Sequence, residues 1–126
     1  MKKDAATLSK ALDLFSDAVD TLRQVTWFPA DKLQRLDEFL NRHRAYFTQL
    51  EAMKIRLASL SKKDENYADL KAALKEENSY LPSFRTQLNS RITYTELELS
   101  GPPAGHQNPA YIAYHDKVVL IYQLPK

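Results

Sequence analysis

The sequence predicts a mainly α-helical chain of α+β class: an elongated antiparallel three-helix, coiled-coil-like bundle followed by a small C-terminal antiparallel β-sheet or hairpin. Two observations carry this prediction. The first ninety residues contain no glycine, whereas both glycines and four of the six prolines follow residue 91. Apolar residues recur at helical spacing before that point and begin to alternate after it. A helical bundle over 1–91 and a β appendix over 92–126 follow from this division.

The first predicted helix covers about residues 4–26. Asp4 is a favourable N-cap, and an apolar stripe at spacings of three and four follows it. Its members are Leu8, Leu12, Phe15, Val19 and Leu22. Trp27-Phe28-Pro29 then interrupts the pattern, because proline disfavours the helical conformation of the residue before it.

A second helix over about 30–61 is the most informative segment, because its apolar residues form adjacent columns spanning about 120° of the helix surface. One neighbouring helix does not cover a face of that width. A continuous helix of about 30 residues is also about 45 Å long, which makes the bundle a rod. The column at one edge of this face contains Phe39, Tyr46, Met53 and Leu60.

The third helix is predicted at 64–80, and a short fourth one at 83–91. Pro82 separates them, since a proline inside a helical pattern ends or kinks the helix. Glu77 occupies an apolar position of the third stripe, so we expect its carboxylate to be paired or exposed to solvent.

The tail is predicted to form strands at about 92–99, 111–115 and 118–124, with a loop at 100–110. Residues 92–99 are rich in β-branched and alternating side chains, and His115-Asp116-Lys117 is interpreted as a hairpin turn. The last strand is apolar on both faces, so it needs cover from the helices or from the edge strand of another chain.

Composition narrows the possible functions. The chain has no cysteine, which excludes disulfides, thiolate metal sites and a cysteine nucleophile. No apolar run approaches the length of a membrane span, and the first residues do not resemble a secretory signal, so a cytoplasmic location is expected. No cofactor motif and no metal-binding spacing is recognisable, and we predict neither a cofactor nor a metal.

The favoured function is non-enzymatic: a protein-interaction or assembly module whose partner is another protein or a second copy of the chain. No membrane and no small-molecule substrate is predicted as a partner. A broad apolar helix face, an elongated body and a two-sided apolar strand support this hypothesis. The residues predicted to carry the interaction are Phe39, Tyr46, Met53 and Leu60 on the second helix, and Val119, Ile121 and Tyr122 in the last strand.

A nucleic-acid-binding protein is the first alternative. Residues 31–63 hold eight basic and four acidic side chains, and a basic row runs beside the apolar column of the second helix. Side chains in such a row can follow the phosphates of a nucleic acid. Its members are Arg35, Arg42, Arg56 and Lys63.

A small nuclease-type toxin, or an inhibitor or immunity protein, is the second alternative. His106 and His115, with Glu96, Glu98 and Asp116 in the same segment, offer acid–base groups. Their spacing is typical of no known site. His43, which lies between leucines on the second helix, is interpreted as a hydrogen-bonded packing residue.

Overall fold

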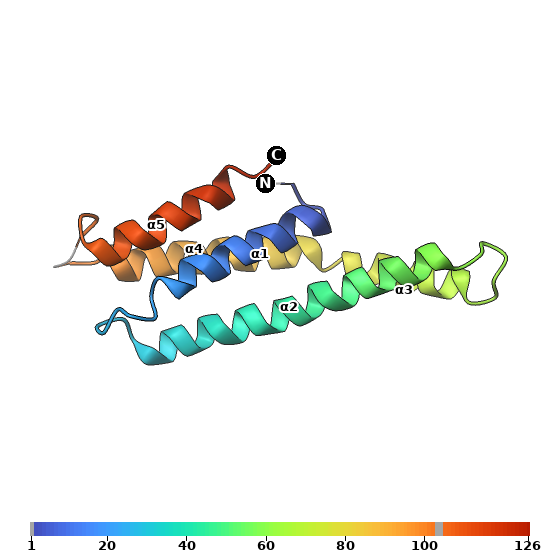
Figure 1. Cartoon of the computed structure of the whole chain (residues 1–126), viewed down its shortest axis with the longest axis horizontal. Helices are drawn as coiled ribbons and strands as arrows, with labels where there is room; N and C mark the ends of the chain where they lie inside the picture. The colour runs from blue at the N-terminus through green and yellow to red at the C-terminus, as the bar shows by residue number, and fades with distance from the viewer. Residues whose placement is uncertain (1, 103–104) are drawn as a thin grey trace.

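The computed structural model describes residues 2–102 and 105–126, and every regular element in these ranges is a helix. α2 runs the full length of the molecule, and α3 and α4 follow one another beside it (Figure 1). α1 and α4 run beside the first part of α2, α5 lies on the far side of α1 from α2, and α3 runs beside the last part of α2. The helices are α1 Ala5–Asp20, α2 Ala30–Ser59, α3 Tyr67–Asn78, α4 Leu81–Ser100 and α5 Pro109–Tyr122.

The predicted C-terminal β-sheet is wrong. Residues 92–99 lie inside α4, and the segments predicted as strands at 111–115 and 118–124 are α5 and the turn that follows it. Residue 91, after which the β appendix was predicted to begin, lies inside α4. The helical bundle itself is present, with α4 and α5 as additional members.

The physical reason is that the helical period of these segments outweighs their β propensity. In α4 the buried residues Leu88, Ile92, Thr95 and Leu99 recur at spacings of four, three and four, which places them on one helix face. β propensity depends strongly on the surroundings of a side chain, and here the surroundings are the packed faces of α1 and α5.

α5 shows the same effect and also carries a start signal. Asn108 accepts a hydrogen bond at Oδ1 from the backbone N–H of Tyr111, 2.8 Å away, and Pro109 occupies the first turn. Tyr114, Val118 and Ile121 are buried at helical spacing. The interpretation of His115-Asp116-Lys117 as a turn fails because these residues lie in the middle of this helix.

Helices α1, α4, α5 and the first part of α2 form a four-helix body with one core. Phe15, Phe84 and Tyr114 are its largest fully buried side chains. The hydroxyl of Tyr114 donates a hydrogen bond to the backbone oxygen of Ile92, 3.1 Å away, so its polar atom is satisfied. Burial raises the pKa of this tyrosine, which therefore stays neutral.

The remaining helix ends follow local signals. Asp4 Oδ1 accepts from the backbone N–H of Thr7 at 2.7 Å and caps α1. α1 ends at Asp20, earlier than the predicted residue 26, and Arg23 then bridges Asp20 and Asp37 at 2.9 and 2.7 Å. Pro82 lies in the first turn of α4, at the predicted break.

The last nine residues of α2, the connection over 60–66 and α3 project from the body as a two-helix arm, residues 51–78 (Figure 1). The arm contains no buried residue, whereas every other helix of the chain contributes to the core. Within the described ranges, no helix has both the length and the apolar composition required to cross a lipid bilayer.

This difference in burial predicts unequal costs of truncation. Phe84→Ala removes a side chain that is fully buried in the body and should lower the free energy of unfolding by about 3–5 kcal/mol. Leu74→Ala removes a half-buried side chain of the arm and should cost about 1 kcal/mol. Urea denaturation followed by circular dichroism measures both, and equal costs would contradict the division into body and arm.

Candidate interaction surface

The arm has a single apolar layer. Two packed helices cover only the sides that face each other, so the side chains between them stay accessible along both edges. The apolar residues of this layer are all half-buried, and Ile55 on the outside of α2 is 62% exposed. They are Met53, Leu57 and Leu60 on the α2 side and Tyr67, Leu70 and Leu74 on the α3 side.

Aromatic side chains join the arm to the body where α3 meets α4. The Tyr46 hydroxyl donates to the backbone oxygen of Glu77 at 2.6 Å, which ties α2 to the end of α3. The rings of Tyr46 and Tyr80 meet edge to face with centroids 5.1 Å apart. Glu77 itself is half-buried at this junction. The base of the arm is therefore held by specific contacts, although the arm is thinly packed.

His43 lies at the same junction and is neutral. Its Nδ1 is 2.8 Å from the backbone oxygen of Phe39, so Nδ1 carries the hydrogen and donates it. Its Nε2 then accepts from the hydroxyl of Tyr80 at 2.7 Å. Burial lowers the pKa of His43, and the charges of Arg42 and Arg91 lower it further. The packing role inferred for this histidine agrees with these contacts.

The lowered pKa of His43 predicts a loss of stability in mild acid. The unfolded chain binds a proton near the ordinary histidine pKa of 6.5, whereas the folded chain resists it, so stability is full above that pH and falls below it. In the wild type, Tm should fall between pH 7.5 and 5.5, by about 3–6 °C for each kcal/mol lost.

His43→Gln should flatten this dependence between the same two pH values, because it removes the buried titrating group. His106→Gln is the matched control, since His106 is exposed, and its pH dependence should equal that of the wild type. Differential scanning calorimetry measures all three proteins. A wild type with the same Tm at both pH values would show that His43 is not held neutral.

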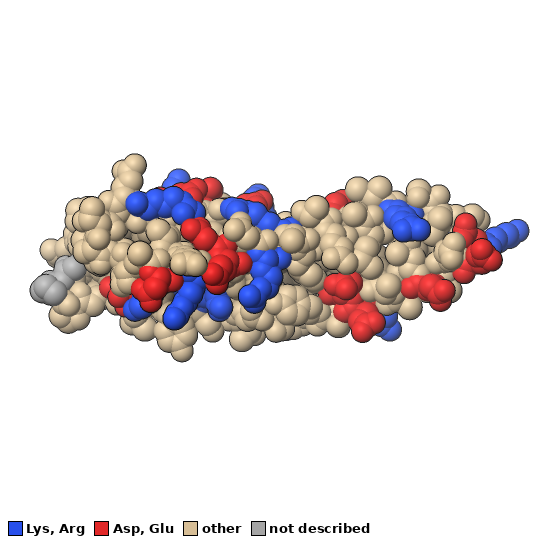
Figure 2. Space-filling model, turned by 90° about the horizontal axis from the view of Figure 1, so that it is seen from below, with Lys and Arg blue, Asp and Glu red and all other residues tan. Residues whose placement is uncertain are grey.

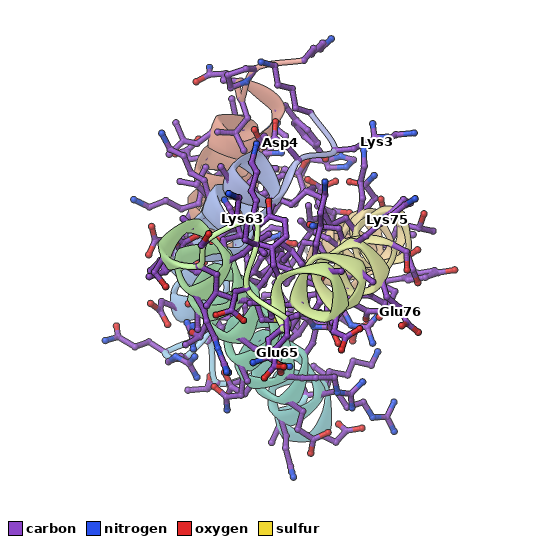
Figure 3. The ribbon with its side chains drawn as sticks, turned by 90° about the vertical axis from the view of Figure 1, so that its right-hand side faces the viewer. Lys3, Asp4, Lys63, Glu65, Lys75 and Glu76 are labelled. Atoms are coloured by element: carbon purple, nitrogen blue, oxygen red, sulfur yellow. The ribbon has the colours of Figure 1, made fainter. Side chains whose placement is uncertain are left out.

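The two halves of the arm sequence differ in net charge. Residues 51–63 carry four basic and one acidic side chain, and residues 64–78 carry five acidic and two basic ones. Much of this difference lies at the tip of the arm, because Lys62, Lys63, Asp64 and Glu65 belong to the connection between the helices. Viewed along the molecule from the free end of the arm, Lys75 and Glu76 extend from the side of α3 away from α2 (Figure 3). Uncharged surface runs along the arm between its charged groups, whereas such groups are denser on the body (Figure 2).

The structure separates the residues predicted to mediate interaction. Phe39 is 2% exposed and lies in the core of the body, so α4 and α1 already cover this part of α2. Tyr46 is half-buried at the base of the arm, and Met53 and Leu60 are half-buried within the arm. In α5, Ile121 is buried and Val119 half-buried, whereas Tyr122 is 53% exposed.

The basic row is divided in the same way. Arg35 and Arg42 lie on the body, Arg56 lies on the arm, and Lys63 lies in the connection at its tip. All four side chains are exposed. Arg91 of α4 reaches α2 as well, with its Cζ 4.5 Å from the ring centroid of Phe39. Nothing in the sequence pattern indicated this arginine, because it comes from a segment predicted to precede a sheet.

Both histidines of the tail contact one tyrosine, Tyr111. His115 Nδ1 is 3.4 Å from Glu96 Oε1, and the Tyr111 ring stacks on His115 with centroids 5.4 Å apart. The ring of His106 meets the ring of the same Tyr111 edge to face, with centroids 4.8 Å apart. His115 and Glu96 therefore form a half-buried acid–base pair.

The other acids of this group lie elsewhere. Glu98 pairs with Lys32 of α2 at 2.6 Å, and Asp116 is exposed on α5. Across 2–102 and 105–126, no three histidine or carboxylate side chains are grouped closely enough to hold a metal ion.

Comparison with known proteins adds no relative: no family model, no curated protein and no solved structure matches the chain.

Proposed function

We propose that the chain is a non-enzymatic assembly module that self-associates through its arm. The observation that supports this proposal is the single apolar layer of residues 51–78, in which none of the large side chains reaches the burial of the core. A second two-helix arm placed against this layer would complete a four-helix bundle of the kind that the body already forms. Met53 and Leu60, from the residues predicted by the sequence, lie in this layer.

Charge supports a second copy as the occupant. A twofold axis parallel to the arm places α2 of one copy over α3 of the other, because it reverses the order of the two helices across the interface. The net basic residues 51–63 of each arm then face the net acidic residues 64–78 of the partner arm. An axis perpendicular to the arm, in the plane of the interface, would instead oppose like charges, so the pattern favours two arms that point in the same direction.

Self-association predicts a dimeric mass. Multi-angle light scattering at tens of micromolar, a concentration at which about micromolar affinity gives mostly dimer, should return about twice the mass of one chain. The mass should decrease on dilution. A monomer at this concentration would contradict the proposal.

A charge-reversal experiment tests the arrangement of the two arms. Arg56→Glu with Lys63→Glu gives residues 51–63 a net negative charge, like residues 64–78. Asp69→Lys with Glu76→Lys instead gives residues 64–78 a net positive charge, like residues 51–63. All four positions are exposed, so the fold should be retained, as circular dichroism would verify. Each variant alone should dissociate at least about tenfold more readily, because like charges then face each other.

Mixing the two variants is the matched control, because it restores opposite charges across both contacts. The mixture should form a heterodimer, and a chain that carries all four changes should again form a homodimer. If the mixture stays monomeric while the wild type is dimeric, the proposed pairing of α2 with α3 is wrong.

The assembly role and the cytoplasmic location stay predictions from the sequence. The half-buried apolar layer of the arm favours the assembly role over the nuclease alternative, because His106 and His115 lie outside the arm.

A further inference from the structure

A groove lies on the body between α2 and α4, at the end of the molecule away from the arm. Its volume is about 270 Å³. Phe28, Leu36 and Thr95 are buried and form an essentially apolar floor. Charged side chains and one tyrosine form the walls: Lys32, Arg35, Arg91, Tyr94 and Glu98.

The walls carry an excess of positive charge. Lys32 Nζ lies 2.6 Å from Glu98 Oε2, so this pair neutralises itself across the groove. Arg35 and Arg91 have no carboxylate partner among the residues that the structure describes. The positive charges of Arg35 and Arg91 at the groove are therefore not neutralised by an ion pair with any described residue. Basic groups also gather on this half of the molecule, with acidic groups among them (Figure 2).

Arg91 is held in place by its packing. Its guanidinium lies over the ring of Phe39, which is itself packed against Phe15 and Phe84 in the core. A cation over an aromatic face is attracted by the ring, and part of the entropy cost of ordering this side chain is already met in the free protein. Arg91 is thus preorganised for an anionic ligand.

Tyr94 provides a planar surface beside these charges. Its side chain is 71% exposed, although it is a large aromatic residue on a helix whose neighbours Ile92 and Thr95 are buried. Exposed aromatic rings beside basic groups are the elements on which the bases of single-stranded nucleic acids stack. The apolar floor favours a ligand that also has an uncharged, flat part.

From this combination we propose that the groove binds a nucleotide unit, with its phosphate on Arg35 and Arg91 and its base on Tyr94. Guanidinium groups bind phosphate through two parallel hydrogen bonds, which a lysine cannot reproduce. The unit can belong to a free nucleotide or to a single strand. This site is separate from the arm, so its occupancy does not depend on self-association.

Fluorescence anisotropy with fluorescein-labelled single-stranded RNA and DNA of about ten nucleotides tests the proposal. Unlabelled adenosine monophosphate serves as the competitor. If adenosine monophosphate displaces the labelled strand, a free nucleotide is sufficient for binding to the groove. If the strand binds but the mononucleotide does not displace it, the ligand is the single strand. Binding of neither the strands nor the mononucleotide, the latter measured by calorimetry, would overturn the proposal.

Three variants locate the binding site. Arg35→Ala and Arg91→Lys should each weaken binding at least about tenfold, the second although it retains the charge. Tyr94→Ala should weaken it about fivefold or more, and this effect should persist at high salt, because stacking is not screened as charge pairing is.

Lys117→Ala is the matched control, since it removes an exposed basic side chain of α5 that does not line the groove. It should leave binding unchanged. If Lys117→Ala weakens binding as much as Arg35→Ala, the affinity comes from diffuse positive charge, and the groove is not the site.

Discussion

The length of α2 relative to the helices that cover it is the constraint on which the rest of the structure depends. α2 has 30 residues and α1 has 16, so at 1.5 Å per residue they are about 45 and 24 Å long. Over the first part of α2, helices α1, α4 and α5 complete a core in which Phe39, Leu40 and Leu50 are almost fully buried. Beyond residue 50 α3 packs beside it and no residue of the arm is buried, so the same apolar face becomes the open layer of the arm.

The junction between body and arm reconciles these two environments. A wide apolar face must pass from four-helix packing to two-helix packing without leaving buried polar groups unsatisfied. His43, Tyr46 and Tyr80 meet this need, because their rings fill the core on one side and their polar atoms find partners at the break between α3 and α4. Such fully bonded networks specify one packing arrangement and stiffen it. The arm consequently has a defined direction despite its thin core.

Two surfaces of different chemistry result from this architecture. The arm offers an apolar layer and opposite net charges on residues 51–63 and 64–78, which suit a symmetric protein contact. The groove between α2 and α4 offers two guanidinium groups without carboxylate partners in the described part of the chain, and an exposed tyrosine, which suit a phosphate joined to a planar group. Both surfaces use the same long helix, at opposite ends, so an assembly through the arm leaves the groove accessible.

Local sequence signals by themselves determined the first helices. Asp4 marks the start of α1, the apolar period of residues 30–61 marks α2 to within two residues of its end, and Pro82 marks the start of α4. Asp4 and Pro82 act within one helical turn, through a backbone hydrogen bond and a fixed φ angle, whereas the apolar period of α2 records which face other helices will cover. Tertiary contacts decided the state of residues 92–124, where β-branched side chains and helical spacing conflict and packing on α1 favours the helix. They also decided the candidate sites: Phe39 was removed from the surface by α4, and Arg91 was brought beside Arg35 from 56 residues away, which no local pattern records.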